Sequence, residues 1–313
     1  MTGTDKDTEK GTEKVAVVVV TYNRADLLRG MLEGLAGLDR APEVVFVVDN
    51  ASTDHTAEVL AEAVASGMLP RLVPITSPEN IGGAGGFHAG LKAAYDDGND
   101  AFWLMDDDVV PAPDCLTRLL EVDGPCLIAV REDRSGALVE KAALRFDLAN
   151  PLAIRPKTAS IDSTYPDRAS MPATVEVENV AFEGFFVRRT VVETIGLPDP
   201  SYFIFYDDVD FAIRARRAGF AILAVRDAVL VRQLDFDQQH DLAGWKGYYM
   251  YRNLFAVHFR YGENVLVRLK PWLIALVVVL LSPLRGGRAE VRNVTRGVRD
   301  ARRMRSLPSR SVD

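Results

Sequence analysis

The sequence of 313 residues has few of the residues that build disulfide scaffolds or metal clusters: two cysteines and four histidines. Neither Cys115 nor Cys126 lies in a CxxC or Cys/His cluster, so we expect both to be small buried hydrophobic residues in a reducing compartment. Residues 1–14 lack the apolar run of a signal peptide and predict a disordered lead-in. No internal repeat is visible.

Positive charge is also scarce, except at the end of the chain. The formal net charge of −7 argues against a general nucleic-acid binder. Residues 285–313 hold nine arginines and three acidic residues, a local charge of +6, which leaves −13 for the rest. This asymmetry predicts an acidic body with a basic C-terminal arm, the one part that would meet a polyanion.

The remaining composition, 48% hydrophobic and 26% charged, is typical of a globular protein. The apolar runs 15–20 and 43–48 predict strands buried on both faces, and helical spacing between them predicts a βαβ unit. The first half therefore predicts a doubly wound α/β fold, and residues 131–175 a lid or a loop insertion with edge strands. Further strands are expected near 72–75, 101–105 and 221–225, and helices at 56–66, 90–95, 190–195, 207–218 and 241–262.

Polar clusters follow three of the expected strands directly. They are Thr21-Tyr22-Asn23-Arg24, Asp49-Asn50-Ala51-Ser52-Thr53-Asp54 and Asp106-Asp107-Asp108. Ligands of open α/β sheets bind at the carboxyl ends of the strands. Each cluster alone is compatible with a cap or turn, but three at one sheet edge predict a ligand crevice.

Two of the motifs favour phosphate and metal chemistry. Three adjacent carboxylates repel each other unless cations neutralise them, and Mg²⁺ or Mn²⁺ prefer such oxygen ligands; the alternative is an acidic turn. The string Asn80-Ile81-Gly82-Gly83-Ala84-Gly85-Gly86-Phe87 is neither GxGxxG nor a P-loop. We interpret it as a glycine-rich loop that approaches a phosphate or sugar closely, with a flexible turn as the alternative.

A second acidic cluster, Asp207-Asp208-Val209-Asp210, opens a predicted helix. A helix N-terminus stabilises carboxylates, so we expect these to stay ionised near neutral pH. An ionised carboxylate facing a crevice is a candidate general base. Asp207 alone is also compatible with an N-cap, and Asp210 with Arg214 predicts an i, i+4 ion pair.

Together these motifs resemble the inverting GT-A glycosyltransferases of family 2. The strings that carry the resemblance are VVVVTYNR (17–24), VVDNASTD (47–54), MDDD (105–108) and YDDVDFAIRARRAG (206–219). NIGGAGGF (80–87) is similar to bacterial galactofuranosyltransferases, especially those that initiate cell-wall galactan; related rhamnosyltransferases share much of the pattern. The resemblance implies a Rossmann-like α/β/α nucleotide-binding domain at 15–240 and a helical C-terminal region at 241–313.

The resemblance also implies roles for single residues. Asp208 would be the catalytic base, oriented by Asp207, and one displacement would invert the anomeric carbon. Asp106 and Asp108 would bind Mn²⁺ or Mg²⁺, and Glu183 and Tyr206 would face the acceptor. The donor would contact Thr21, Tyr22, Asn23, Arg24, Asp49, Asn50, Asn80, Gly83, Ala84, Gly85, Gly86, Phe87, Asp106 and Asp107.

One position departs from the family pattern. Arg232 stands where a metal-ligating histidine is expected. His240 is a substitute ligand off the family spacing; alternatively Arg232 contacts the diphosphate, or water completes the metal site.

The segment 271–284 (PWLIALVVVLLSPL) is uncharged and apolar. As a helix it would reach about 21 Å, short of the roughly 30 Å of a bilayer core. With arginines on both sides it predicts an interfacial anchor on anionic lipid; a buried core helix or a homo-oligomer contact is the alternative. A cytoplasmic enzyme, peripheral on the inner face of the plasma membrane, would thereby reach a polyprenyl-diphosphate-linked glycan.

The sequence thus predicts transfer of galactofuranose from UDP-galactofuranose to such a lipid-linked oligosaccharide. A rhamnosyltransferase that uses dTDP-rhamnose is the nearest alternative. A sugar nucleotidyltransferase would need a basic glycine-rich loop after the first strand, where this chain has TYNRADLL. A non-catalytic nucleotide-sugar-binding module is the third alternative.

Overall fold

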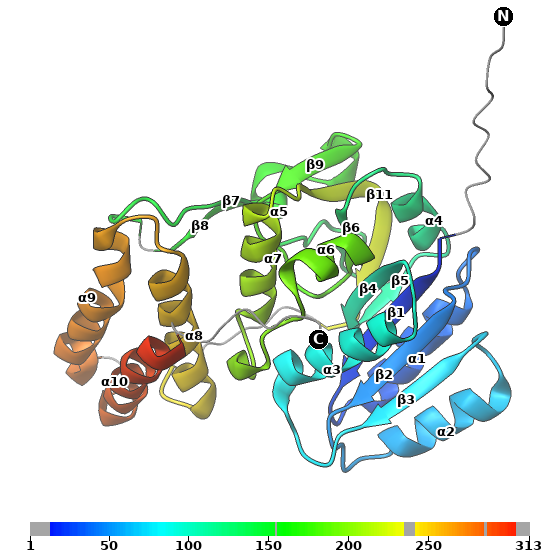
Figure 1. Ribbon diagram of the computed structural model, residues 1–313, viewed down its shortest axis with the longest axis horizontal. Helices are drawn as coiled ribbons and strands as arrows, with labels where there is room; N and C mark the ends of the chain where they lie inside the picture. Colours follow the sequence, from blue (N-terminus) through cyan, green and yellow to red (C-terminus); the bar gives the residue numbers. More distant parts are fainter. Residues whose placement is uncertain (1–12, 154, 235–241, 285–286, 305–313) are drawn as a thin grey trace, which may run out of the picture.

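A nine-stranded mixed sheet organises the chain (Figure 1). The computed structural model describes residues 13–153, 155–234, 242–284 and 287–304. The strand order is β3-β2-β1-β4-β10-β6-β11-β5, and β9 also pairs with β11. The strands are β1 (Val15–Thr21), β2 (Val44–Asp49), β3 (Leu72–Thr76), β4 (Ala101–Asp106), β5 (Val109–Pro111), β6 (Cys126–Glu132), β9 (Thr174–Val177), β10 (Phe185–Arg188) and β11 (Ile222–Arg232).

Helices cover both faces of this sheet, because its central strands are apolar on both sides. In β1, Val15, Val17 and Val19 pack toward one core, and Ala16, Val18 and Val20 toward the other. The first core is closed by α1 (Ala25–Ala36), α2 (Thr56–Ser66) and α4 (Cys115–Leu120). The second is closed by α3 (Gly82–Asp96), α6 (Arg189–Ile195) and α7 (Asp207–Arg217). Both cysteines are buried and free, as predicted.

The glycine-rich string is helical, contrary to the predicted loop: its residues from Gly82 onward form the first turns of α3. The reason is close packing against β1. A Cβ at Gly86 would lie 2.5 Å from Val20 Cγ1, and one at Gly90 would lie 2.4 Å from Val18 Cγ1. Glycine therefore serves helix–sheet contact here, which outweighs its low helix propensity.

The insertion predicted at 131–175 holds small elements around the main sheet. β7 (Ala143–Phe146) and β8 (Lys157–Ser160) form a separate antiparallel pair, followed by α5 (Ile161–Thr164) and η1 (Arg168–Ser170). The short helix η2 (Pro200–Tyr202) precedes α7. Because β9 pairs with β11, the insertion ends inside the main sheet.

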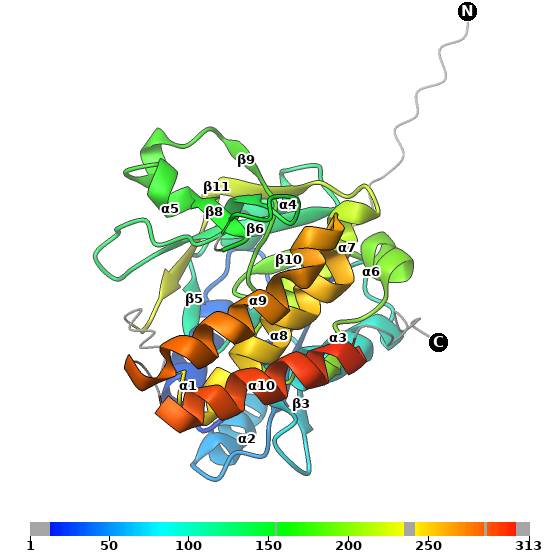
Figure 2. The ribbon, with the colours of Figure 1, turned by 90° about the vertical axis from the view of Figure 1, so that its left-hand side faces the viewer.

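Three helices pack together beyond α7, on the side of the molecule away from β3 (Figures 1 and 2). They are α8 (Trp245–Tyr261), α9 (Val265–Leu281, continued by η3, Ser282–Leu284) and α10 (Gly287–Met304). α10 buries Val294, Val298, Ala301 and Met304 in a core shared with α8. Residues 287–304 of the predicted basic arm are thus a docked helix. Among the described residues, no helix combines the length and apolarity needed to cross a bilayer.

Candidate active site

The three predicted polar clusters meet at one edge of the sheet. Thr21 ends β1 opposite Asp49 of β2, and Val20 pairs with Asp106 of β4. Their alignment follows from parallel strands that end at the same level. The edge is therefore a polar rim above two apolar cores.

The middle carboxylate of the triplet, Asp107, is held by the chain itself. Its Oδ2 accepts from Thr21 Oγ1 at 2.7 Å, and its Oδ1 from Arg24 Nη1 at 3.0 Å. Burial raises the pKa of Asp107 even so. Arg24 Nη1 also lies 3.3 Å from Asp108 Oδ2. Thr21 and Arg24, predicted donor residues, thus anchor the triplet.

The loops after β1 and β2 are tied to each other. Thr53 N donates to Asn23 Oδ1 at 2.7 Å, and Ser52 N donates to Asp49 Oδ1 at 2.9 Å. Tyr22 is 44% exposed, so its ring is free to meet a ligand, whereas Asp49 is buried at the strand end.

Asn50 joins this rim to the start of α3. Its Nδ2 donates to Gly82 O at 2.9 Å, and its Oδ1 accepts from Ile81 N at 3.1 Å. Asn80 Oδ1 accepts from Gly82 N at 2.9 Å. A Cβ on Gly82 would lie 2.0 Å from Phe203 O, so the helix start and the segment before α7 touch.

The predicted donor residues of α3 divide into two sets. Ala84 and Phe87 are buried, and the Phe87 ring lies 4.7 Å from that of Phe182, so both contribute to packing. Gly85 faces Ile81 and Gly86 faces Val20, whereas a Cβ on Gly83 would meet open space. Gly83 is the member of the string best placed to face a ligand.

The second acidic cluster opens α7, as predicted. Val209 N donates to Asp208 Oδ1 at 2.7 Å. Burial raises the pKa of Asp208 to about 6, and the charge of Glu183 adds to the rise. Burial and Asp208 raise the pKa of Asp207 well above its usual range. Desolvation therefore outweighs the effect of the helix N-terminus at both residues. The expectation that these carboxylates stay ionised near neutral pH holds for Asp208, whose pKa of about 6 leaves it largely ionised, and is not supported for Asp207.

Glu183, predicted to face the acceptor, lies between the two acidic clusters. It forms an ion pair with Arg131, and Arg232 Nη2 lies 3.5 Å from its Oε2. Burial opposes its ionisation, but these arginines outweigh burial and lower the pKa of Glu183. Its charge in turn raises the pKa of Asp106, Asp108 and Asp208. Glu183 therefore couples the strand-end triplet to the start of α7.

Arg131 is buried and bidentate to Glu140, with Nε–Oε2 and Nη2–Oε1 distances of 2.9 Å. Arg232, where the family pattern has a histidine, ends β11 with its side chain 10% exposed. Its charge lowers the pKa of Asp108. The position therefore brings a fixed cation to the carboxylates, where a histidine would bring a metal ligand.

A strained segment carries the chain into α7. Phe203, Phe205 and Tyr206 have φ values of 64°, 66° and 68°, a region that non-glycine residues rarely adopt and that costs about 1–3 kcal/mol each. Burial and Asp208 raise the pKa of Tyr206 to about 12. Tyr206, a predicted acceptor residue, is thus held beside Asp208 by unusual backbone geometry.

Helix α8 holds this segment in place. The buried side chain of Asn253 donates through Nδ2 to Tyr202 O at 3.0 Å, Ile204 O at 2.7 Å and Phe205 O at 2.9 Å. Arg252 Nη2 donates to Ser201 O at 2.8 Å and to Tyr202 O at 2.7 Å. These bonds satisfy carbonyls that a turn of this shape leaves free.

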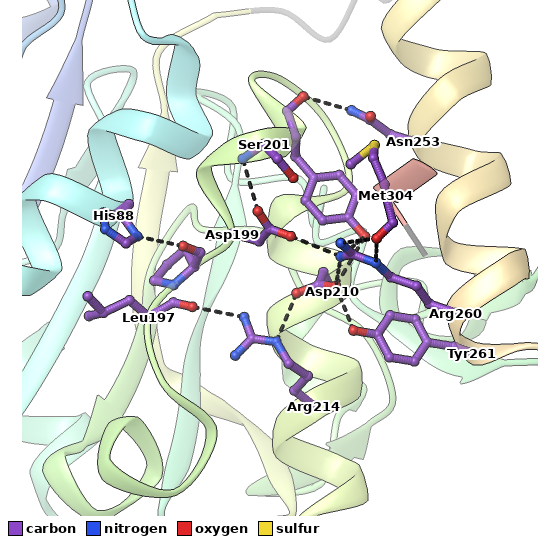
Figure 3. Close-up of polar contacts among 12 residues, drawn as sticks. His88, Leu197, Asp199, Ser201, Asp210, Arg214, Asn253, Arg260, Tyr261 and Met304 are labelled. Atoms are coloured by element: carbon purple, nitrogen blue, oxygen red, sulfur yellow. Dashed lines mark hydrogen bonds and ion pairs between the residues drawn. The ribbon is translucent and has the colours of Figure 1, made fainter. Parts of the chain in front are cut away.

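The last acidic residue of the cluster, Asp210, is fully engaged (Figure 3). Its Oδ2 accepts from Arg214 Nε at 2.8 Å, the predicted ion pair. Its Oδ1 accepts from Tyr261 Oη at 2.6 Å, Tyr202 Oη at 3.1 Å and Arg260 Nη1 at 3.1 Å. Arg260 also donates through Nη2 to Met304 O at 2.7 Å. The helix that carries Asp208 is thereby connected to the end of α10.

Comparison with known proteins decides the family. A family model described as glycosyl transferase family 2 matches residues 16–124. The chain is 32% identical over 212 residues to galactofuranosyltransferase GlfT1 of Mycolicibacterium smegmatis, covering 66% of this chain and 67% of the relative. It is 31% identical over 234 residues to galactofuranosyltransferase GlfT1 of Mycobacterium tuberculosis, covering 72% of each. The chain belongs to glycosyl transferase family 2.

A solved structure confirms the fold of this glycosyltransferase. The mannosyltransferase PcManGT from Pyrobaculum calidifontis, in complex with GDP-Man and Mn²⁺, aligns with a TM-score of 0.57 and 20% identity. The alignment covers 96% of this chain and 78% of that chain. The predicted GT-A fold with C-terminal helices is therefore confirmed.

The carboxylates at the end of β4 fit a divalent cation. Asp108 Oδ1 is buried without a hydrogen-bond partner. Burial raises the pKa of Asp106 well above its usual range, and Asp108, Glu183 and Asp107 add to the rise. A cation between Asp106 and Asp108 would relieve both. The described residues hold no group of three or more His, Cys, Asp or Glu side chains arranged for a metal, so the donor or water would complete the site. His240 lies outside the described residues.

Sequence reasoning missed three residues that support this transferase site: Arg131, Asn253 and Arg260. Each lies in a segment read only as an insertion or an aromatic helix, and each contacts its partner from about 10 to 50 positions away. The one available signal was that Asn253 and Arg260 are polar residues in an otherwise aromatic helix.

Proposed function

We propose that this family 2 transferase moves galactofuranose from UDP-galactofuranose to a polyprenyl-diphosphate-linked oligosaccharide of the cell envelope. The donor assignment rests on the two relatives named galactofuranosyltransferase, at 32% and 31% identity. The reaction assignment rests on the electrostatic coupling of the two acidic clusters: the charge of Glu183, which is ion-paired to Arg131, raises the pKa of Asp208 and also those of Asp106 and Asp108.

In the proposed reaction Asp208 accepts the proton of an acceptor hydroxyl. The hydroxyl oxygen then forms a bond to the anomeric carbon while the bond to the diphosphate breaks on the opposite face, which inverts the configuration. A base with a pKa of about 6 is largely ionised at neutral pH and still receives a proton readily. Asp207 stays beside it, with a pKa that burial and the charge of Asp208 raise.

The diphosphate leaving group would bind at the carboxyl ends of the strands. Asp106 and Asp108 would hold Mn²⁺ or Mg²⁺, which supplies Lewis-acid neutralisation of the diphosphate. Arg232 and Arg24 place positive charge at the same carboxylates. The rim residues Tyr22, Asn23, Asp49 and Gly83 would contact the nucleotide and its sugar.

The decisive experiment offers purified protein two donors, UDP-galactofuranose or dTDP-rhamnose, with Mn²⁺ or Mg²⁺ and a synthetic polyprenyl-diphosphate disaccharide. Product masses are read after incubation. We expect a hexose addition from UDP-galactofuranose alone. A deoxyhexose product would replace this donor by dTDP-rhamnose, and no product from either donor would overturn the proposed transfer.

We also propose that α9 places the enzyme on the membrane surface that carries its acceptor, on the cytoplasmic face of the plasma membrane. α9 buries Val267, Ala275 and Val278 toward its neighbours. Its other side exposes a continuous apolar stripe, with Leu266 62%, Leu273 59% and Leu280 68% exposed. The stripe is Val265, Leu266, Leu269, Trp272, Leu273, Leu276, Val277, Leu280 and Leu281.

Exposed arginines of α10 accompany this stripe, on a helix packed against α9 (Figure 2). An apolar helix face beside basic residues is the pattern of interfacial binding to anionic lipid. Vesicle flotation tests it with Leu269→Ser, Leu273→Ser and Leu276→Ser combined. We expect this variant to stay at the bottom of the gradient. The control combines Val64→Ser, on the exposed face of α2, with Met68→Ser, just after the end of α2; equal flotation of both variants would refute the anchor.

A further inference from the structure

The hairpin formed by β7 and β8 rests directly on the helix that carries the base. Ala143, Phe146 and Leu148 pack with Val209 and Ile213 of α7, and Val257 of α8 joins the same cluster. The hairpin is therefore positioned by the same helices that position Asp208.

The connection between β7 and β8 reaches α9 at its other end (Figure 1). Lys270 Nζ donates to Asn150 O at 2.7 Å and to Ala153 O at 2.8 Å. Asn264 Nδ2 donates to Ala149 O at 2.6 Å. Leu152, in the same turn, is 87% exposed, so the turn that contacts α9 carries an exposed apolar side chain of its own. One short element thus joins the stripe to the base.

Two cations lie between these ends, Arg155 and Lys157, and both are exposed. Within the described residues Arg155 has no ion pair with a carboxylate. Its charge acts on Tyr206, whose pKa it lowers against the larger effect of burial. The charge of Lys157 acts in the same way on Asp208. The geometry agrees for Lys157: it pairs in the hairpin with Phe146, and Phe146 packs with Val209, the residue that follows Asp208.

The surroundings of Lys157 favour a bound anion. Desolvation lowers the pKa of Lys157, and the nearby cations Arg131 and Lys141 add to the decrease against Glu140 and Asp162. Those two carboxylates are already engaged, Glu140 by Arg131 and Asp162 by Lys141. Lys157 Nζ donates to Lys141 O, which uses one of the three donors of its ammonium group. An anion at the exposed end of Lys157 would accept from the remaining donors and offset the repulsion between the neighbouring cations.

We propose that Arg155 and Lys157 bind the phosphate anion of the lipid-linked acceptor, an inference that rests on the proposed function. The order along the molecule is apolar stripe, cations, carboxylate. A lipid-linked sugar has the same order: hydrocarbon chain, phosphate, sugar hydroxyl. The hydrocarbon would lie on α9 with Leu152, the phosphate at the hairpin, and the hydroxyl at Asp208.

Binding to vesicles tests this site without any turnover. The probes are phosphatidylcholine vesicles that carry polyprenyl diphosphate, and the same vesicles with an equal charge of phosphatidylglycerol. Arg155→Gln with Lys157→Gln should weaken sedimentation with the diphosphate vesicles about tenfold or more, since two charged hydrogen bonds to the phosphate are lost. Sedimentation with phosphatidylglycerol vesicles should decrease much less.

The matched control removes two exposed arginines from the same insertion, Arg134→Gln with Arg145→Gln; neither acts on Asp208 or Tyr206. We expect it to bind both kinds of vesicle like the parent protein. Equal losses on both kinds of vesicle in the Arg155 and Lys157 variant would show attraction to surface charge in general and overturn the proposal. Unchanged binding to the diphosphate vesicles would overturn it as well.

A kinetic comparison separates this inference from the proposed function. With transfer measured at pH 8, where Asp208 is ionised in all variants, the KM for the diphosphate acceptor should rise more than that for an uncharged alkyl glycoside. An equal rise for both acceptors would contradict a phosphate site. Failure of the parent protein to transfer galactofuranose, with vesicle selectivity retained, would overturn the proposed function and leave the anion site standing.

Discussion

The two acidic clusters of the molecule are built in the same way but supported differently. In each, one carboxylate is held by arginine, Asp107 by Arg24 and Asp210 by Arg214 and Arg260. In each, the adjacent carboxylates have raised pKa values because they are buried beside one another. Each cluster thus places a carboxylate that arginine holds directly beside buried carboxylates with raised pKa values.

The difference lies in where the support comes from. Asp107 is held from the loop after β1, inside the α/β domain, and the Arg24 side chain is 44% exposed. Asp210 is held from α8, and Arg260 continues the connection to α10. The donor side is therefore complete within the sandwich, whereas the base side needs the C-terminal helices.

The largest expected effect is on the chemical step at the second cluster. Asp208→Asn keeps the shape of the side chain but removes the proton acceptor, so turnover should fall about 10²–10⁴-fold while UDP binding by calorimetry is retained. Asp114→Asn, a half-exposed carboxylate that precedes α4, is the control. Undiminished turnover in Asp208→Asn would refute the base assignment.

The next effect is on stability, and it should differ between the two clusters. Asp210→Asn leaves Arg214 without its buried charge partner and Arg260 with Asp199 alone, so the free energy of unfolding should fall by about 3–5 kcal/mol. Asp107→Asn should cost about 1 kcal/mol, because water compensates the half-exposed Arg24. Urea denaturation of both variants measures the difference; equal losses would contradict the comparison.

A smaller effect concerns the cation expected at the first cluster. Asp108→Asn removes one carboxylate ligand, so the Mn²⁺ concentration for half-saturation in the presence of UDP should rise about tenfold or more. Mn²⁺ titration by electron paramagnetic resonance measures it without turnover. Asp123→Asn, an exposed carboxylate, should leave the titration unchanged, and the same curve for both variants would rule out Asp108 as a ligand.

The smallest effect is a shift in pH dependence through Glu183. Asp208 works when deprotonated, so kcat/KM should rise with pH through about 6 and then level off. Glu183→Gln removes a negative charge that raises the pKa of Asp208, and it frees the charge of Arg131. The pH at which kcat/KM reaches half of its plateau value should therefore decrease, by about one unit or less. A shift to higher pH, or the same shift in the exposed-surface variant Glu176→Gln, would contradict this coupling.

The sequence predicts those features of the structure that short, continuous stretches of residues determine. Buried β-branched runs such as 15–20 predict parallel strands, and their ends predict where Thr21, Asp49 and Asp106 meet. The start of α3 was not predictable from propensity, because four glycines disfavour a helix and only packing on Val18 and Val20 explains it. The raised pKa values of Asp207 and Asp208 were not predictable either, because burial is a tertiary property.

Asn253 illustrates why the surroundings of the proposed base could not be predicted from the sequence. A single amide reaches three carbonyls about 50 positions earlier in the chain, and nothing in the local sequence of α8 indicates those partners. The positive φ values of Phe203, Phe205 and Tyr206 are equally hidden, since aromatic residues do not predict left-handed backbone.

The hydrogen bonds that Asn253 donates to this strained turn also imply an order of folding. The sandwich can close around β1–β4 and form its donor rim as soon as its own strands pair. The turn before α7 cannot keep its left-handed residues until α8 docks and supplies the amide. A partly folded chain would therefore form the proposed donor site before the proposed base is in place. Neither an acceptor nor a water molecule could be activated until α8 has docked.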